Sequence, residues 1–74
     1  MAVLEAVTMR EIQRIFEVTD ALGIHREMLV IPLRPQHPGR VRKMPGGKIE
    51  IVVEAEGPFE DWAAGLAEQI RKLA

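Results

Sequence analysis

The sequence predicts an α+β domain in which two helices pack on one face of a small antiparallel sheet. Two amphipathic segments with helical spacing lie towards the ends of the chain, and two short segments rich in β-branched residues lie between them. The expected order is therefore helix, strand, long loop, strand, helix (α-β-β-α). The chain contains no internal repeat or linker-like tract, so residues 1–74 are interpreted as one domain.

The first helix is predicted over about 8–22. Thr8 and Glu11 have the spacing of a capping box, and Gly23 follows as the left-handed residue that commonly ends a helix. Residues 2–6 either extend this helix by one turn or form a short edge strand, and both readings stay open. Behind the cap, one apolar stripe recurs every three or four residues: Ile12, Ile15, Phe16, Thr19 and Leu22.

Two strands are predicted, over about 27–33 and about 48–54, joined as a hairpin by a basic loop at 34–47. Pro32 lacks an amide hydrogen, so it belongs at a sheet edge or outside the ladder. The loop is inferred from its prolines and glycines. Alternation in the second strand directs one set of side chains towards the core: Ile49, Ile51 and Val53.

The last helix is predicted over about 58–73. Pro58 suits the first helical position, where its missing N–H is harmless, and Glu60 and Asp61 complement the positive end of the helix dipole. Phe59 and Trp62 are expected to be core anchors, or interface anchors where this helix faces a partner.

The amino-acid composition limits the kinds of site and reaction that the chain can support. The chain has no Cys, Ser, Asn or Tyr, so disulfides and thiolate metal sites are excluded. Thr8 and Thr19 carry its only aliphatic hydroxyls, and neither has a triad-like partner at a recognisable spacing. We therefore expect no enzyme, no catalytic residue and no cofactor. The missing Asn and Cys are typical of thermophilic proteins and also of biased base composition. A cytoplasmic location is expected, with no membrane span.

Charge is strongly sorted along the chain. Residues 34–48 carry five basic side chains and no acid, whereas residues 49–61 carry five acids and no base. Arginine binds phosphate and carboxylate in a bidentate manner, so the basic segment is a candidate binding surface. The alternative is a structural role, in which these cations balance the charge of the neighbouring acids. The candidate residues are Arg34, His37, Arg40, Arg42, Lys43 and Lys48.

The residue pattern favours neither a metal site nor a catalytic acid–base pair. His25 and His37 are twelve residues apart, with no second His or Cys at ligand spacing, so no metal site is predicted. Glu50 and Glu54 lie on one face of the predicted strand and could form an acid–base pair. Alternating charge on the solvent-facing side of a strand accounts for both residues without a catalytic role.

The second half of the chain resembles the core of small zincin-type metallopeptidases, in which a helix, a sheet and an active-site helix follow in this order. The topology covers residues 8–74, and the motif only Leu66–Lys72. In that family, His-Glu-x-x-His follows an apolar and a small residue. Here Glu68 and Lys72 stand at the zinc-histidine positions and Gln69 at the catalytic glutamate. The resemblance thus implies at most a catalytically silent relative.

The sequence favours a small non-enzymatic interaction module that uses the basic segment and the adjacent acidic surface. A homodimer is expected, because two strands rarely form a stable sheet alone and a chain this small buries little surface. A protein partner is a further expectation. Nucleic-acid backbone binding through the basic loop and the silent zincin-like relative remain as alternatives.

Overall fold

The centre of the fold is β3 (Ile49–Val52), the middle strand of a three-stranded sheet with the order β1-β3-β2. In this computed structural model, which describes residues 3–73, β1 (Leu29–Val30) runs parallel to β3 and β2 (Arg40–Lys43) runs antiparallel to it. The predicted α+β class is confirmed. The sheet, however, is mixed, and the prediction of an antiparallel sheet was wrong for the β1–β3 pair.

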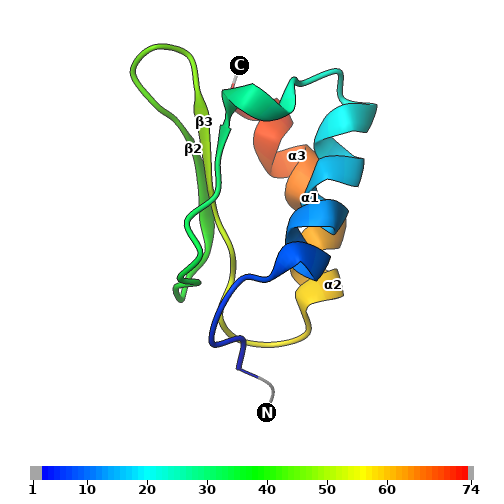
Figure 1. The fold of residues 1–74 in the computed structure, drawn as a ribbon, viewed down its shortest axis with the longest axis vertical. Coiled ribbons are helices and arrows are strands. Elements are labelled where there is room, and N and C mark those ends of the chain that lie inside the picture. Colours follow the sequence, from blue (N-terminus) through cyan, green and yellow to red (C-terminus); the bar gives the residue numbers. More distant parts are fainter. Residues whose placement is uncertain (1–2, 74) are drawn as a thin grey trace.

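The helices form a second layer on one face of the sheet (Figure 1). They are α1 (Met9–Ala21), α2 (Phe59–Ala64) and α3 (Leu66–Arg71). Apolar side chains from both layers meet between them, and burying such surface is the main favourable term in folding. The buried cluster consists of Val7, Ile15, Ile51, Val53, Leu66 and Ile70.

The first helix lies within its predicted range. The Thr8 N–H donates to a Glu11 carboxylate oxygen at 2.8 Å, as the capping-box spacing indicated. After the helix, Gly23 adopts a φ of 76°, in the left-handed region that glycine tolerates best. Ile15 and Thr19 are the buried residues of α1.

The strand predicted over 27–33 is much shorter than expected. Arg26–Met28 form a 3₁₀ turn, η1, in which the Met28 N–H donates to the His25 carbonyl at 3.0 Å. Only Leu29 and Val30 then enter the ladder, and Pro32 beyond them has no N–H to contribute. The prediction of a hairpin between this strand and 48–54 was also wrong, because the two strands are parallel.

The basic loop predicted over 34–47 contains the third strand, β2, which forms the actual hairpin with β3. Pro45 and Gly46 occupy the centre of its turn, and Gly46 and Gly47 have φ values of 89° and 88°. The Met44 N–H donates to the Lys48 carbonyl at 2.7 Å and closes the hairpin. A turn with proline followed by left-handed glycine is of type II.

The last predicted helix, 58–73, is divided at Gly65 into α2 and α3. The Gly65 N–H donates to the Trp62 carbonyl at 3.1 Å, a bond of 3₁₀ type that tightens the turn. At the other end of the chain, Val3 forms an isolated antiparallel bridge with Glu56. Residues 2–6 therefore add a single bridge to the described structure, and residue 2 lies outside the described residues.

Candidate binding surface on the sheet

The candidate residues are positioned by the face of the sheet that the helices do not cover, here called the outer face. Strand alternation places Glu50, Val52 and Glu54 on the opposite side of the sheet from the buried Ile51 and Val53. In the register of the hairpin, Arg40 is paired with Val52 and Arg42 with Glu50. The outer face thus combines cations from β2 with acids from β3.

Arg42 and Glu50 form an ion pair across the two strands. The Arg42 Nε donates to a Glu50 carboxylate oxygen at 2.6 Å, and the Glu50 side chain is only 15% exposed whereas that of Arg42 is 56% exposed. This contact uses one of the five N–H groups of the guanidinium. Glu50 therefore orients Arg42, and the two terminal nitrogens of Arg42 keep donors for another acceptor.

The chain changes from one edge of the sheet to the other at residues 37–39, here called the crossover. Gln36 bridges to Glu54 on the β1 side, and β2 begins at Arg40 on the other side. Gly39 passes so close to β3 that an added Cβ would lie 2.6 Å from the Glu54 backbone nitrogen. Only glycine fits without displacing backbone, so this residue fixes the path of the crossover.

The Glu54 carboxylate holds the crossover in place. One oxygen accepts from the Gly39 N–H at 3.1 Å, and the other accepts from His37 Nδ1 at 2.7 Å and from the Glu56 N–H at 3.0 Å. These bonds, the one from His37 above all, lower the pKa of Glu54 to about 2. Glu54 raises the pKa of His37 in turn, with a smaller contribution from Glu56. Because Glu54 stays ionised, it is unsuited to act as a general acid near neutral pH.

The four other predicted cations are exposed and lie in different parts of the sheet and its connections. Arg40 lies on the outer face, Lys48 at the turn end of β3, and Arg34 in the segment before the crossover, along the edge opposite β2. Lys43 lies on the helix-covered side, beside Ile70. Within residues 3–73, these four cations form no ion pair, unlike Arg42. The structure therefore separates the candidate set, and Arg40, Arg42, Lys43 and Lys48 remain together as what we call the basic edge.

The two predicted interface anchors pack inside the fold. Phe59 and Trp62 are half-buried against the core cluster, with ring centroids 5.8 Å apart and planes tilted by 43°. The indole Nε1 is buried without a hydrogen-bond partner in the structure. A role for either residue in an interface stays a prediction.

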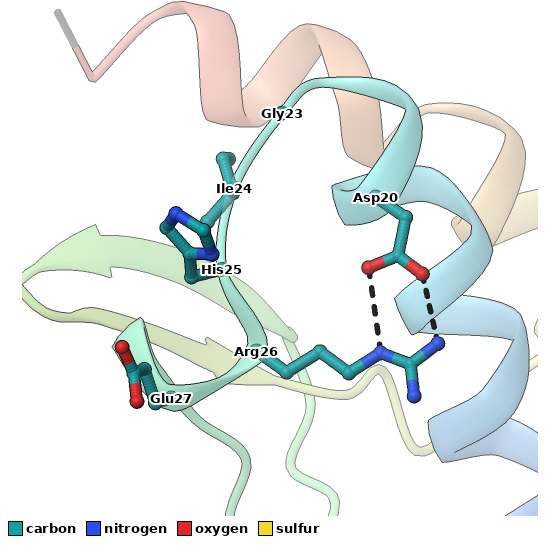
Figure 2. A pocket seen from close by; sticks show the side chains of 6 residues that line it. All are labelled: Asp20, Gly23, Ile24, His25, Arg26 and Glu27. Atoms are coloured by element: carbon teal, nitrogen blue, oxygen red, sulfur yellow. Dashed lines mark hydrogen bonds and ion pairs between the residues drawn. The ribbon is translucent and has the colours of Figure 1, made fainter.

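A shallow hollow lies where α1 turns into η1, between Asp20 and Glu27 (Figure 2). Arg26 spans it and forms two hydrogen bonds with the Asp20 carboxylate, at 2.8 and 3.4 Å. Its guanidinium also lies 4.4 Å from the centre of the Phe16 ring. In Figure 2, His25 and Glu27 point away from this ion pair, so the polar groups of the hollow do not converge on one ligand position. Sequence reasoning missed the Asp20–Arg26 pair, for which opposite charges flanking the Gly23 turn were the available signal.

Neither a metal centre nor the zincin motif is assembled in the described part of the chain. No group of three or more His, Asp or Glu side chains among residues 3–73 is arranged to hold a metal ion. Glu68 lies on α3 and its carboxylate is 3.5 Å from the Arg71 guanidinium. Lys72 caps the same helix and is exposed. The zincin resemblance thus finds no ligand set among these residues.

In comparisons with known proteins, no protein-family model, no curated protein and no solved structure matches this chain. Among the residues that the structure describes, no helix has both the length and the apolar character needed to cross a membrane.

Proposed function

We propose that this chain is a non-enzymatic protein-interaction module that binds through the basic edge. The observation that carries this proposal is the placement of four exposed cations in the β2–β3 hairpin, three on the edge strand β2 and Lys48 directly before β3. Among residues 3–73, Arg40, Lys43 and Lys48 form no ion pair. Such a concentration of positive charge attracts an acidic surface and speeds association with it.

A protein partner is favoured over nucleic acid by what accompanies these cations. Phe59 and Trp62 are half-buried against the core cluster, and the Arg26 guanidinium lies over the Phe16 ring at 4.4 Å, so the three aromatic side chains offer no open platform for stacking bases. The sequence pI of about 6.1 is low for a dedicated nucleic-acid binder.

Self-association is the first interaction to examine, although one reason for expecting it no longer applies. A two-stranded sheet would need a third strand from residues 2–6 or from a second chain, and a homodimer was favoured for that reason, whereas β2 supplies the third strand from within the chain. The remaining reason is the small size of the domain, which limits the surface it can bury alone.

Sedimentation velocity on tag-free protein, at low and high salt, tests the proposal. Association through the basic edge should weaken with salt and in the double variant Arg40→Glu/Lys48→Glu. The matched control Arg10→Glu/Arg34→Glu changes the net charge equally at exposed positions elsewhere and should associate as the wild type does. Adding short mixed-sequence RNA separates the classes of partner: a shift that occurs only with RNA would replace the proposed function with nucleic-acid binding.

A further inference from the structure

The outward edge of β2 carries unused backbone hydrogen-bonding groups. Met44 and Lys48 form a hydrogen-bonded pair, and such pairs alternate along an antiparallel ladder. With this register, Arg42 and Arg40 direct their backbone groups towards β3. The N–H and C=O groups of Val41 and Lys43 therefore point away from the sheet. No strand in the described residues pairs with this edge.

The two faces beside this edge differ in chemistry. On the outer face, Arg40 and Arg42 are exposed, and Glu50 holds Arg42 in place through its Nε while the terminal nitrogens remain free to bind a carboxylate. On the helix-covered face, a hollow of about 250 Å³ adjoins β2. It is lined mainly by apolar side chains, together with one lysine: Lys43, Gly47, Ile49, Ile70 and Leu73.

We propose that β2 binds an extended acidic segment of a partner protein as an added strand. Acidic residues at alternate positions would lie beside Arg40 and Arg42, and the apolar residues between them would face the hollow. Main-chain bonds to Val41 and Lys43 supply affinity, and the alternating side chains supply specificity. This inference rests on the proposed function and names its binding mode and class of partner.

A second copy of β2 is a poor occupant of the same edge. Its sequence, Arg-Val-Arg-Lys, would bring like charges opposite one another in any self-pairing. Like charges directly across two strands are destabilising, and natural proteins use basic residues on edge strands to prevent such pairing. Charge complementarity thus selects a segment of opposite sign.

The test uses the intact protein and the fluorescein-labelled peptide Glu-Val-Glu-Val-Glu-Val, with binding followed by fluorescence anisotropy at low salt. Two further peptides are N-methylated, one at its three valines and the other at its three glutamates. In antiparallel pairing the residues opposite Val41 and Lys43 are valines, so only valine amides point towards β2. We expect valine methylation to abolish binding and glutamate methylation to preserve it. The opposite result identifies parallel pairing, which also supports strand addition.

Equal binding of both methylated peptides would overturn the inference and reduce the contact to charge alone. Absence of binding by the parent peptide would overturn it as well. Arg40→Glu/Lys48→Glu should lower the affinity at least about tenfold, and Arg10→Glu/Arg34→Glu should leave it unchanged. If the peptide does not bind but sedimentation still shows association through the basic edge, the proposed function is supported and strand addition is contradicted. Binding of short RNA in place of the peptide overturns both.

Discussion

The two faces of β3 are both largely hidden from solvent, and they achieve this by different means. On the inner face, Ile51 and Val53 are fully buried by apolar side chains of the helices. On the outer face Val52 is only 2% exposed, and the side chains of Glu50 and Glu54 are 15% and 18% exposed, although no helix covers them. Here Arg42 forms an ion pair with Glu50, and the crossover residues His37 and Gly39 bond to Glu54. The inner face therefore stabilises the fold, whereas the outer face fixes the path of the chain and presents the basic edge.

Truncating the inner face should have the largest effect. Ile51→Ala removes three carbons from the fully buried core, so we expect a loss of about 2–5 kcal/mol in the free energy of unfolding. Urea denaturation monitored through the Trp62 fluorescence measures this loss. A cost well below 1 kcal/mol would show that the core is less tightly packed than the structure indicates.

The crossover should be sensitive to a single methyl group. Gly39→Ala places a Cβ against the backbone of β3, and we expect a destabilisation of about 1–3 kcal/mol. Gly65→Ala is the matched control, because the neighbour recorded nearest to its added Cβ, the Trp62 carbonyl oxygen, would lie 3.8 Å away, at an ordinary contact distance. This control should be neutral or stabilise the protein by up to about 1 kcal/mol. Equal effects of the two changes in thermal denaturation would contradict the close approach at residue 39.

The cross-strand ion pair should contribute less than either of these features. Arg42→Met removes the pair with Glu50 and retains much of the aliphatic side chain, so a cost of about 0.2–1 kcal/mol is expected. Repeating the measurement at high salt should shrink the difference between variant and wild type. A difference that salt leaves unchanged would mean that Arg42 acts by packing and not by charge.

The His37–Glu54 pair should give the smallest effect, visible as a dependence on pH. The pKa of His37 is raised from 6.5, so its contribution is complete below that value and is lost as pH rises through the folded pKa. The pKa of Glu54 is lowered from 4.5 to about 2, so its contribution is complete above 4.5 and is lost as pH falls through about 2. Both contributions are therefore present between pH 4.5 and 6.5.

Thermal denaturation of wild type and His37→Gln across pH examines this window. The difference in melting temperature should be greatest between pH 4.5 and 6.5 and should decline at higher pH. NMR titration of the His37 ring gives its pKa directly. A pKa at or below 6.5 would show that the ring is not held by Glu54 in solution.

Local patterns were sufficient for much of the fold and for little of the candidate surface. The capping box at Thr8, the stop at Gly23 and the apolar alternation of β3 each depend on neighbours in sequence. The strand at Arg40–Lys43 was missed because a basic edge strand has no apolar alternation to reveal it. The turn residues Pro45-Gly46-Gly47, flanked by two extended segments, were the available hairpin signal.

The sequence by itself determined the α+β class, the start of α1 at its capping box and the division of β3 into an apolar and an acidic face, because these depend on side chains within a short segment. It placed Pro58 one position too far into the last helix, since Pro58 is the N-cap of α2. Only the tertiary structure decided that β1 runs parallel to β3, that the chain crosses over at residues 37–39, and which cations share an edge. Strand order and direction follow from contacts between residues distant in sequence, such as Gly39 with Glu54, and local periodicity carries no information about such contacts.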